Sequence, residues 1–305
     1  MNSIKGKIIN YNESFFGEII FNQNINKINK IETFNNDVII IPGFVDLHCH
    51  GGNGFDTMEG YASIKEMSNF HLLHGTTTLL PTTWTSGFDN ILKTLKSIDE
   101  LINDENNNIE GIHLEGPFIN PNKLGAQPAL TQLPSYDFIE NILKDVDIKI
   151  ITLAPEIEGM NEFIDFLINK DIRVQFGHTL ADFKTTNEYL EKYNVGFTHL
   201  YNAMSGHSSR KSGVLSAALL NGKHAEIICD GYHVSEQAIK IAKKCIPGLY
   251  AVSDSISATG LSDGEYNFAG IEIIKKNNIV TIKDSNTLAG SAINMYQTFK
   301  NLIQM

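Results

Sequence analysis

The sequence predicts an α/β protein in which eight parallel strands alternate with helices as a (β/α)₈ barrel of the TIM type, preceded by a small β-domain. After Pro42, apolar runs of strand length alternate with segments whose apolar residues recur every three or four positions. Each connection is long enough to cross over to a parallel neighbour. The alternation alone does not exclude a doubly wound sheet.

Residues 1–41 consist of short apolar stretches separated by polar turns, which is typical of a small β-meander. We therefore expect two domains, with β-strands over 1–41 and the barrel over 42–305. Helices are expected between the barrel strands, for example over 58–75 and 160–171. The eight predicted barrel strands are 43–49, 76–81, 109–115, 148–154, 172–178, 195–201, 225–230 and 249–254.

The composition narrows the class of protein. A chain of 305 residues that is 42% hydrophobic can bury a large core. The net charge of −11 disfavours a nucleic-acid partner, which usually requires a basic excess. The N-terminus lacks the apolar segment of a signal peptide, and no apolar run is long enough to predict a membrane span. The three cysteines form no CxxC pair, which indicates reduced thiols in a cytoplasmic protein.

The first predicted barrel strand ends in His48-Cys49-His50, followed by two glycines. Alternate residues of a strand point to the same face, so His48 and His50, the HxH pair, present two imidazoles side by side. Cys49 faces the other way. Two imidazoles at a strand end suit a metal or a proton relay. Two polar side chains at a loop boundary are the plainer interpretation, so this motif alone decides little.

Other predicted strand ends carry residues suited to the same chemistry. Glu115 ends the third strand, and His178 and His199 end the fifth and sixth. This Glu–His–His triad is able to hold a divalent metal and leave room for water. Asp254 ends the eighth strand, where a general base beside that water is expected, although taken alone a helix cap or a loop residue is the better interpretation of it. His113 lies one layer deeper and is expected to pack behind the site.

Several stretches of the chain resemble the N-acetylglucosamine-6-phosphate deacetylase family of the amidohydrolase superfamily. In family order they are "PGFVDLHCHGG", "GIHLEGPFINPNKLGAQ", "FGHT", "THLYNAM", "CDGYHV", "AVSD" and "LAGS". The resemblance extends over roughly the whole chain. "HLEGPF" and "HLYNAM" are specific to the family, whereas HxH occurs in many related hydrolases. The resemblance implies hydrolysis of N-acetylglucosamine 6-phosphate to glucosamine 6-phosphate and acetate.

The resemblance also implies roles for the strand-end residues. The Glu–His–His triad would hold the catalytic metal, and Asp254 would act as general base and then general acid. Some family members lack the HxH motif and use one metal. This chain has the motif, so the HxH pair could hold a second ion, with Glu115 as the bridge. We therefore expect one or two divalent cations per chain, such as zinc or iron.

A further set of residues is implied to contact the sugar phosphate. In the family, the arginine that matches Arg210 reaches into the neighbouring subunit's site, which implies a homodimer. Some relatives have a histidine where this chain has Gln127, and glutamine is able to donate a hydrogen bond but carries no charge. The implied contact residues are Ala126, Gln127, Asn202, Ala203, Arg210, His233, Leu288, Ala289 and Gly290.

Two alternative functions make different predictions. Amidohydrolases of the dihydroorotase or hydantoinase type commonly use a carboxylated lysine at the end of the fourth strand, but here that strand ends "TLAPE". The other alternative is a truncated sugar-phosphate-binding protein without activity. Relatives continue beyond the position of Met305 with strands that complete the small β-domain, so an incomplete domain is expected. The intact metal and base positions argue against a decayed site.

Overall fold

The computed structural model describes residues 1–33, 37–104, 107–144 and 146–305. These residues form two compact units, Met1–Phe44 and Val45–Met305. All of the site residues predicted from the sequence belong to the second unit.

The first unit is a small β-sheet. Strands β1 (Asn2–Ile9), β2 (Ser14–Phe21) and β3 (Ile25–Lys30) form an antiparallel meander, and β4 (Ile39–Ile40) pairs with β1 in parallel. The sheet order is β3-β2-β1-β4. The apolar stretches of this segment are therefore strands, as the sequence predicts.

The second unit is built mainly on parallel strands. The eight strands in the predicted barrel region are β5 (Phe44–Cys49), β8 (Thr76–Thr83), β9 (Ile112–Glu115), β10 (Ile148–Leu153), β11 (Arg173–Phe176), β12 (Gly196–Phe197), β13 (His224–Ile228) and β14 (Gly248–Val252). Six of them, β5 to β12, form one sheet in chain order, in which the pairs from β8 onward run parallel. β13 and β14 form a separate parallel pair.

Hydrogen bonds connect these two groups of strands. The Leu200 amide, after β12, donates to the Glu226 carbonyl of β13 at 2.8 Å. The Asp254 amide, after β14, donates to the His48 carbonyl of β5 at 2.9 Å, and Cys49 and Ser255 form a parallel bridge. The last strand thus leads back to the first, which gives a curled parallel sheet.

Several predicted strands are longer than the observed ones, because the backbone turns at their carboxyl ends. The positive φ angles there are 50° at His178, 30° at His199 and 48° at Asp254. A left-handed conformation cannot continue a strand ladder, so β11 stops at Phe176 and β12 at Phe197. The residues predicted to do chemistry stand on these turns.

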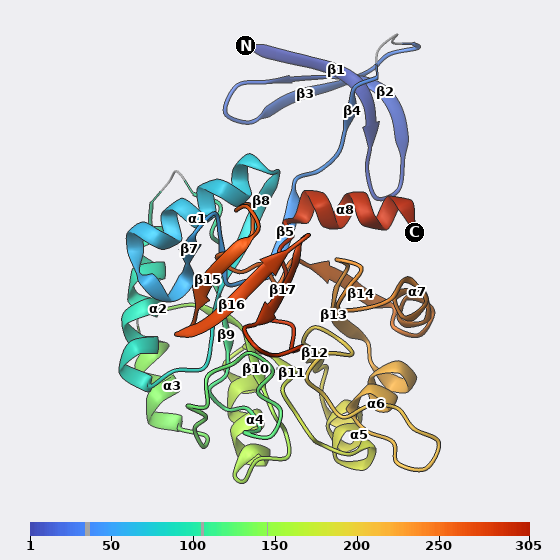
Figure 1. Cartoon of the computed structure of the whole chain (residues 1–305). Helices are drawn as coiled ribbons and strands as arrows, with labels where there is room; N and C mark the ends of the chain where they lie inside the picture. The colour runs from blue at the N-terminus through green and yellow to red at the C-terminus, as the bar shows by residue number, and fades with distance from the viewer. Residues whose placement is uncertain (34–36, 105–106, 145) are drawn as a thin grey trace. The chain divides into compact units, whose positions relative to one another are not determined.

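Helices alternate with the strands and lie around their outer side (Figure 1). The α-helices are α1 (Tyr61–Leu73), α2 (Phe88–Ile102), α3 (Tyr136–Ile142), α4 (Met160–Asn169), α5 (Phe183–Lys192), α6 (Val214–Asn221), α7 (Glu236–Cys245) and α8 (Met295–Gln304). In α2, Ile91, Leu95 and Ile98 are fully buried at helical spacing. Each such side chain contributes roughly 1.5–3 kcal/mol by leaving water.

A further antiparallel sheet follows β14 and was not predicted from the sequence. It consists of β15 (Gly264–Phe268), β16 (Ile271–Lys276) and β17 (Ile279–Ile282). Its buried residues Phe268, Ile273 and Val280 form a second hydrophobic cluster with Trp84. The signal was present in the short apolar runs "IEIIKK" and "IVTI", separated by two asparagines.

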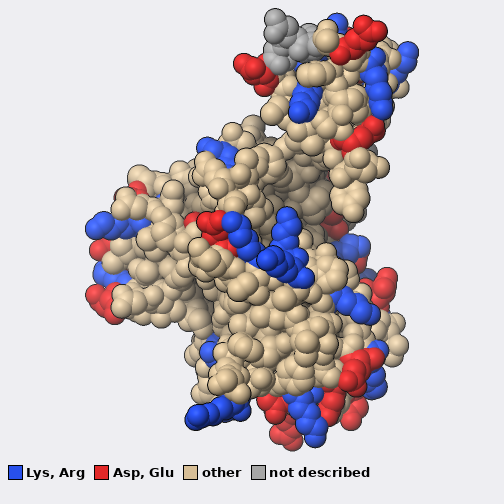
Figure 2. Space-filling view, turned by 90° about the vertical axis from the view of Figure 1, so that its right-hand side faces the viewer, with Lys and Arg blue, Asp and Glu red and all other residues tan. Residues whose placement is uncertain are grey.

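Short elements complete the second unit: β6 (Gly51–Gly52), β7 (Phe55–Asp56) and the 3₁₀ turn η1 (Thr57–Glu59). Among the helices of the described residues, none combines the length and apolar character that a bilayer span requires. On the face shown in Figure 2, acidic and basic side chains are interspersed rather than gathered into one continuous basic surface.

Candidate metal and substrate site

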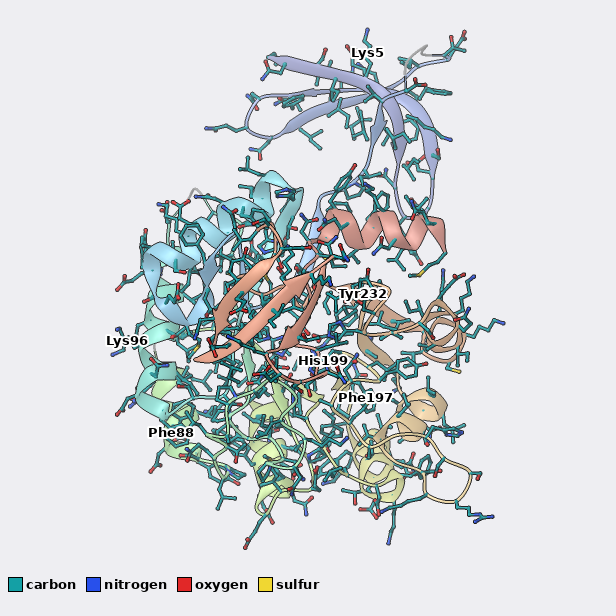
Figure 3. The ribbon with its side chains drawn as sticks, viewed as in Figure 1. Lys5, Phe88, Lys96, Phe197, His199 and Tyr232 are labelled. Carbon is teal, nitrogen blue, oxygen red and sulfur yellow. The ribbon has the colours of Figure 1, made fainter. Side chains whose placement is uncertain are left out.

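The ends of the parallel strands border a cavity of about 560 Å³. Its walls come from the ends of β9, β11 and β12, from the loops that follow β9 and β12, and from the segment that follows β17. Figure 3 shows His199 in the middle of the second unit, whereas Lys96 of α2 points outward. The predicted site residues that line the cavity are His50, Glu115, Ala126, Gln127, His178, His199, Asn202, Ala203, His233, Asp254, Leu288 and Gly290.

The Glu–His–His triad is in contact at the base of this cavity. Glu115 Oε1 lies 3.2 Å from His178 Nε2 and 3.1 Å from His199 Nε2. The two Nε2 atoms are 3.1 Å apart. All three side chains are buried. One carboxylate and two imidazole nitrogens that converge from three strand ends form a donor set that fits a divalent ion.

The HxH pair lies on the other side of the same carboxylate. The Nε2 atoms of His48 and His50 are 3.1 Å apart, and Glu115 Oε2 lies 3.6 Å and 3.1 Å from them, respectively. Asp254 Oδ1 lies 3.5 Å from both. Glu115 therefore offers one oxygen to each pair of histidines, which is the arrangement that a bridging ligand requires.

Three of the side chains that meet at this centre stand on strained backbone. His178, His199 and Asp254 all have left-handed φ angles, which L-residues rarely adopt. Each such residue costs about 1–3 kcal/mol, and such strain clusters at active sites because surrounding structure enforces it. These turns hold the three side chains against the strand-end cavity.

Outer hydrogen bonds orient the imidazoles. His178 Nδ1 lies 2.9 Å from the Lys123 carbonyl, and His50 Nδ1 lies 3.1 Å from the Thr82 carbonyl. A carbonyl only accepts, so each Nδ1 must carry the hydrogen, which leaves the Nε2 lone pair facing the centre. The ring orientation is thus already the one that a metal ligand needs.

The charge state of Glu115 also suits a ligand. Burial acts to raise the pKa of Glu115, but without a metal the charge of protonated His48 and hydrogen bonds from protonated His178 and His199 outweigh it and hold the pKa well below its ordinary value. The carboxylate therefore stays ionised at neutral pH. Metal ligation requires this deprotonated form.

Gln127 contacts the centre directly. Its Nε2 donates to Glu115 Oε2 at 2.5 Å, and its Oε1 accepts from the Thr85 amide at 2.7 Å. The second bond fixes which end of the amide faces Glu115. Ala126 lines the cavity beside it.

His233 contributes an imidazole to the cavity wall, where Asp230 holds it. Its Nδ1 lies 2.7 Å from Asp230 Oδ2, and its backbone amide donates to Asp230 Oδ1 at 2.8 Å. Burial acts to lower the pKa of His233, but the hydrogen bond and charge of Asp230 outweigh it and raise the pKa above its ordinary value. Asn202 and Ala203 line the same cavity.

Two predicted contact residues are not part of the cavity wall that the described residues form. Ala289 is fully buried in the second hydrophobic cluster, where its amide donates to the Val280 carbonyl. Its neighbours Leu288 and Gly290 line the cavity instead. Arg210 is exposed in the loop between β12 and α6.

His113 lies behind the site, one layer below Glu115. It is fully buried, and its Nε2 and Nδ1 contact Thr152 Oγ1 at 2.7 Å and the Leu47 carbonyl at 3.0 Å. Burial, and then the charge of His48, lower the pKa of His113 to about 4. It is therefore a neutral packing residue.

Several residues of this region were not predicted from the sequence. Glu226 of β13 is fully buried and lies 2.9 Å from His48 Nδ1. The signal was an acidic residue inside the apolar run "AEIICD". Cavity-lining residues that were also not singled out are Asn122, Lys123, Leu124, Gly125, Phe268, Asn286 and Thr287.

Comparison with known proteins identifies the family. None of the protein-family models searched matches the sequence. The chain is 36% identical over 278 residues to N-acetylglucosamine-6-phosphate deacetylase of Bacillus subtilis, and the match covers 87% of this chain and 70% of that protein. The chain belongs to the N-acetylglucosamine-6-phosphate deacetylase family. The resemblance in its sequence motifs is thereby confirmed.

Other members of the family agree. The Vibrio furnissii enzyme of the same name is 31% identical over 87% of this chain and 68% of its own length. An N-acetylgalactosamine-6-phosphate deacetylase of Escherichia coli O157:H7 is 28% identical over 88% of this chain and 73% of its own. The family is one of hydrolases, which favours a deacetylase over the other amidohydrolase types considered.

Solved structures of the family share the fold. The Thermotoga maritima N-acetylglucosamine-6-phosphate deacetylase superposes with a TM-score of 0.89 at 32% identity, covering 99% of this chain and 84% of that one. A Mycobacterium smegmatis variant, solved in complex with N-acetyl-D-glucosamine-6-phosphate, gives a TM-score of 0.90 at 26% identity, covering 99% and 83%.

Proposed function

We propose that this protein removes the acetyl group of N-acetylglucosamine 6-phosphate by metal-dependent hydrolysis, giving glucosamine 6-phosphate and acetate. The observation that carries the proposal is the contact of Glu115 Oε1 with the Nε2 atoms of His178 and His199, beside Asp254, in a strand-end cavity. Membership of the deacetylase family supports the same reaction.

We infer that the eight strands close as a (β/α)₈ barrel over 42–305, preceded by a β-domain over 1–41. The hydrogen bond from the Asp254 amide to the His48 carbonyl, which joins the end of β14 to β5, supports closure. Chemistry at the carboxyl ends of the strands is the rule for such barrels. The three cysteines are all free, which supports the cytoplasmic location that we also propose.

The roles of the residues follow from their positions. A divalent ion held by the Glu–His–His triad would lower the pKa of a bound water and polarise the acetyl carbonyl. Asp254 accepts a proton as the water oxygen bonds to the acetyl carbon. It then gives that proton to the amide nitrogen as the C–N bond breaks, because an amine leaves poorly unless it is protonated. Acetate and the free amine are the products.

A second ion is proposed at the HxH pair, bridged to the first by Glu115. Replacing both His48 and His50 with asparagine should lower the metal content by about one ion per chain, because an asparagine side chain replaces each imidazole nitrogen with a weaker, shorter donor. Elemental analysis of protein purified without added metal measures this. The exposed His74→Asn variant is the matched control and should keep the wild-type content. An unchanged content in the double variant would remove the HxH pair from metal binding.

The sugar phosphate is proposed to bind between His233, Asn202 and Ala203, with Arg210 reaching the site of a second copy in a homodimer. Exposure of Arg210 outside the cavity lining of its own chain supports such sharing. A guanidinium fork matches the geometry of phosphate.

Replacing Arg210 with alanine should weaken use of N-acetylglucosamine 6-phosphate by roughly 1.5–3 kcal/mol, the range for hydrogen bonds to charged groups. Unphosphorylated N-acetylglucosamine should be affected much less, since it has no phosphate to lose. The measurement is kcat/KM for both substrates, with the neighbouring exposed Lys211→Ala variant as control. Equal losses on both substrates would contradict the phosphate role.

Mixing Arg210→Ala chains with Asp254→Asn chains tests the sharing. In a mixed dimer, one site has an intact Asp254 and receives an intact Arg210 from its partner. Activity should therefore rise above that of either variant alone. If the subunits demonstrably exchange and no activity returns, Arg210 does not act across the dimer.

The function itself is tested by acetate release from N-acetylglucosamine 6-phosphate and from its galacto epimer, since one relative carries the galactosamine name. We expect turnover of the gluco substrate with the higher kcat/KM. Failure to turn over either substrate with a full metal complement would refute the deacetylase proposal and favour the sugar-phosphate-binding alternative.

A further inference from the structure

Glu226 is a fully buried acidic residue that the proposed reaction does not use. It lies in the middle of β13, between Ala225 and Ile227, which are themselves buried. It is not among the described residues that line the cavity. Burying an ionised carboxylate is unfavourable unless polar partners compensate for the lost water. Its partners should therefore show what the carboxylate does.

Both oxygens of Glu226 accept hydrogen bonds from side chains. Oε2 lies 2.9 Å from His48 Nδ1, and Oε1 accepts from Gln175 Nε2 at 2.7 Å. The Tyr250 hydroxyl adds a longer contact to Oε1 at 3.4 Å. Gln175 therefore holds one oxygen of the carboxylate, and the other oxygen contacts His48.

His48 stands between Glu226 and the metal donor cluster. Its Nδ1 faces Glu226, while its Nε2 lies 3.1 Å from His50 Nε2 and 3.5 Å from Asp254 Oδ1. An ionised carboxylate has no hydrogen to donate, so His48 must donate through Nδ1. Metal binding requires the neutral imidazole, which has one N–H, so a hydrogen on Nδ1 leaves Nε2 with the lone pair that a metal needs.

The acceptor at His48 differs in kind from those at the other oriented histidines. His50 and His178 rest on backbone carbonyls, of Thr82 and Lys123. A hydrogen bond to an ionised acceptor is roughly twice as strong as a neutral one, and a carboxylate also makes the imidazole a stronger donor of electrons to a metal. The imidazole that Glu226 contacts is that of His48, in the HxH pair; its contact with the triad is a longer hydrogen bond from the His199 backbone amide to Oε2, at 3.4 Å.

We propose that Glu226 is a positioning residue that holds His48 with its hydrogen on Nδ1 and thereby supports the ion at the HxH pair, independently of the ion at the Glu–His–His triad. The inference rests on the proposed function in one respect, namely that a second ion binds at the HxH pair. It assigns Glu226 no contact with substrate.

The first test compares metal content in three variants. Glu226→Leu, which keeps the size but removes the acceptor, should lose about one ion per chain and keep the other. Glu226→Gln still offers one oxygen to His48 if the Gln175 amide turns over, so it should retain the second ion with affinity lowered by roughly 10- to 100-fold, the range for outer-shell partners of ligands. Tyr250→Phe disturbs the same buried network without touching His48 and should keep the wild-type metal content. Circular dichroism checks that each variant is folded.

A second measurement needs no variant. In zinc-loaded wild-type protein with ¹⁵N-labelled histidine, long-range ¹H–¹⁵N spectra should assign the His48 hydrogen to Nδ1 and zinc to Nε2. A hydrogen on Nε2 would overturn the proposal even if Glu226→Leu failed to fold. The proposal would also be overturned if the wild-type protein held one ion per chain and the Glu226→Leu variant held the same amount.

Acetate release by the wild-type enzyme, measured in parallel, separates the two claims. Absence of turnover, together with the expected metal and NMR results, would refute the deacetylase function and leave the role of Glu226 standing. Turnover by the wild type, together with an unchanged metal content in folded Glu226→Leu, would refute the role of Glu226 and leave the deacetylase function standing.

Discussion

Replacing Asp254 with asparagine should lower deacetylase turnover by at least roughly two orders of magnitude, the usual contribution of general acid–base catalysis. Asparagine keeps the shape of the side chain but cannot accept the proton of the attacking water or return it to the amine. Asp254 Oδ1 lies 3.5 Å from the Nε2 atoms of both histidines of the HxH pair, so the loss occurs beside the metal donors. Steady-state kinetics should show the effect in kcat.

Substrate should still bind to this variant, as a binding assay with N-acetylglucosamine 6-phosphate would show. Asp89→Asn, at an exposed position in the first turn of α2, is the matched control and should turn over normally. Near-normal turnover by Asp254→Asn would assign the base elsewhere. His233, which lines the same cavity, is then the next candidate.

Glu115→Gln should lose metal and activity together. Glu115 Oε1 faces the two imidazoles of the triad and Oε2 faces the HxH pair. Glutamine offers one oxygen and one amide nitrogen, so one side of the centre loses its ligand and gains a donor that repels metal. Both ion positions depend on this side chain. Glu115→Gln should therefore lose more metal and more activity than a substitution of any single histidine ligand.

Elemental analysis and acetate release measure the two effects in one preparation. Glu110→Gln, at an exposed position before β9, is the matched control and should match the wild type in both. A full metal complement in Glu115→Gln would remove Glu115 from the ligands, whatever the variant's activity.

The convergence of Glu115, His178 and His199 could be predicted from the sequence because it depends on one rule of the fold. Residues at the carboxyl ends of parallel strands meet at one edge of the sheet, and hydrophobic runs locate those ends. His178 and His199 were placed next to Glu115 on that basis, and the structure brings their side-chain nitrogens within 3.2 Å and 3.1 Å of its carboxylate. Their left-handed turns were not predicted from the sequence, because positive φ is uncommon for any non-glycine residue, even for histidine, which is enriched there.

Other features depend on tertiary contacts that a single sequence does not encode locally. The partner of Glu226 is His48, 178 residues away, and only the pairing of strands brings them together. In "LAGS", the resemblance treated Leu288, Ala289 and Gly290 alike, yet the packing of β17 buries Ala289 and leaves its neighbours at the cavity. The β15–β17 sheet lacks the helix–strand alternation that located the other strands.

The most direct test of the central claim is to titrate metal-free protein with divalent ions while acetate release from N-acetylglucosamine 6-phosphate is followed. Chelator-treated protein should be inactive, and activity should return in proportion to the ion bound at the Glu–His–His triad. The Asp254→Asn variant should bind the same ions without regaining turnover. Full turnover by protein shown to contain no metal, or no turnover at any metal content, would contradict a metal-dependent deacetylase.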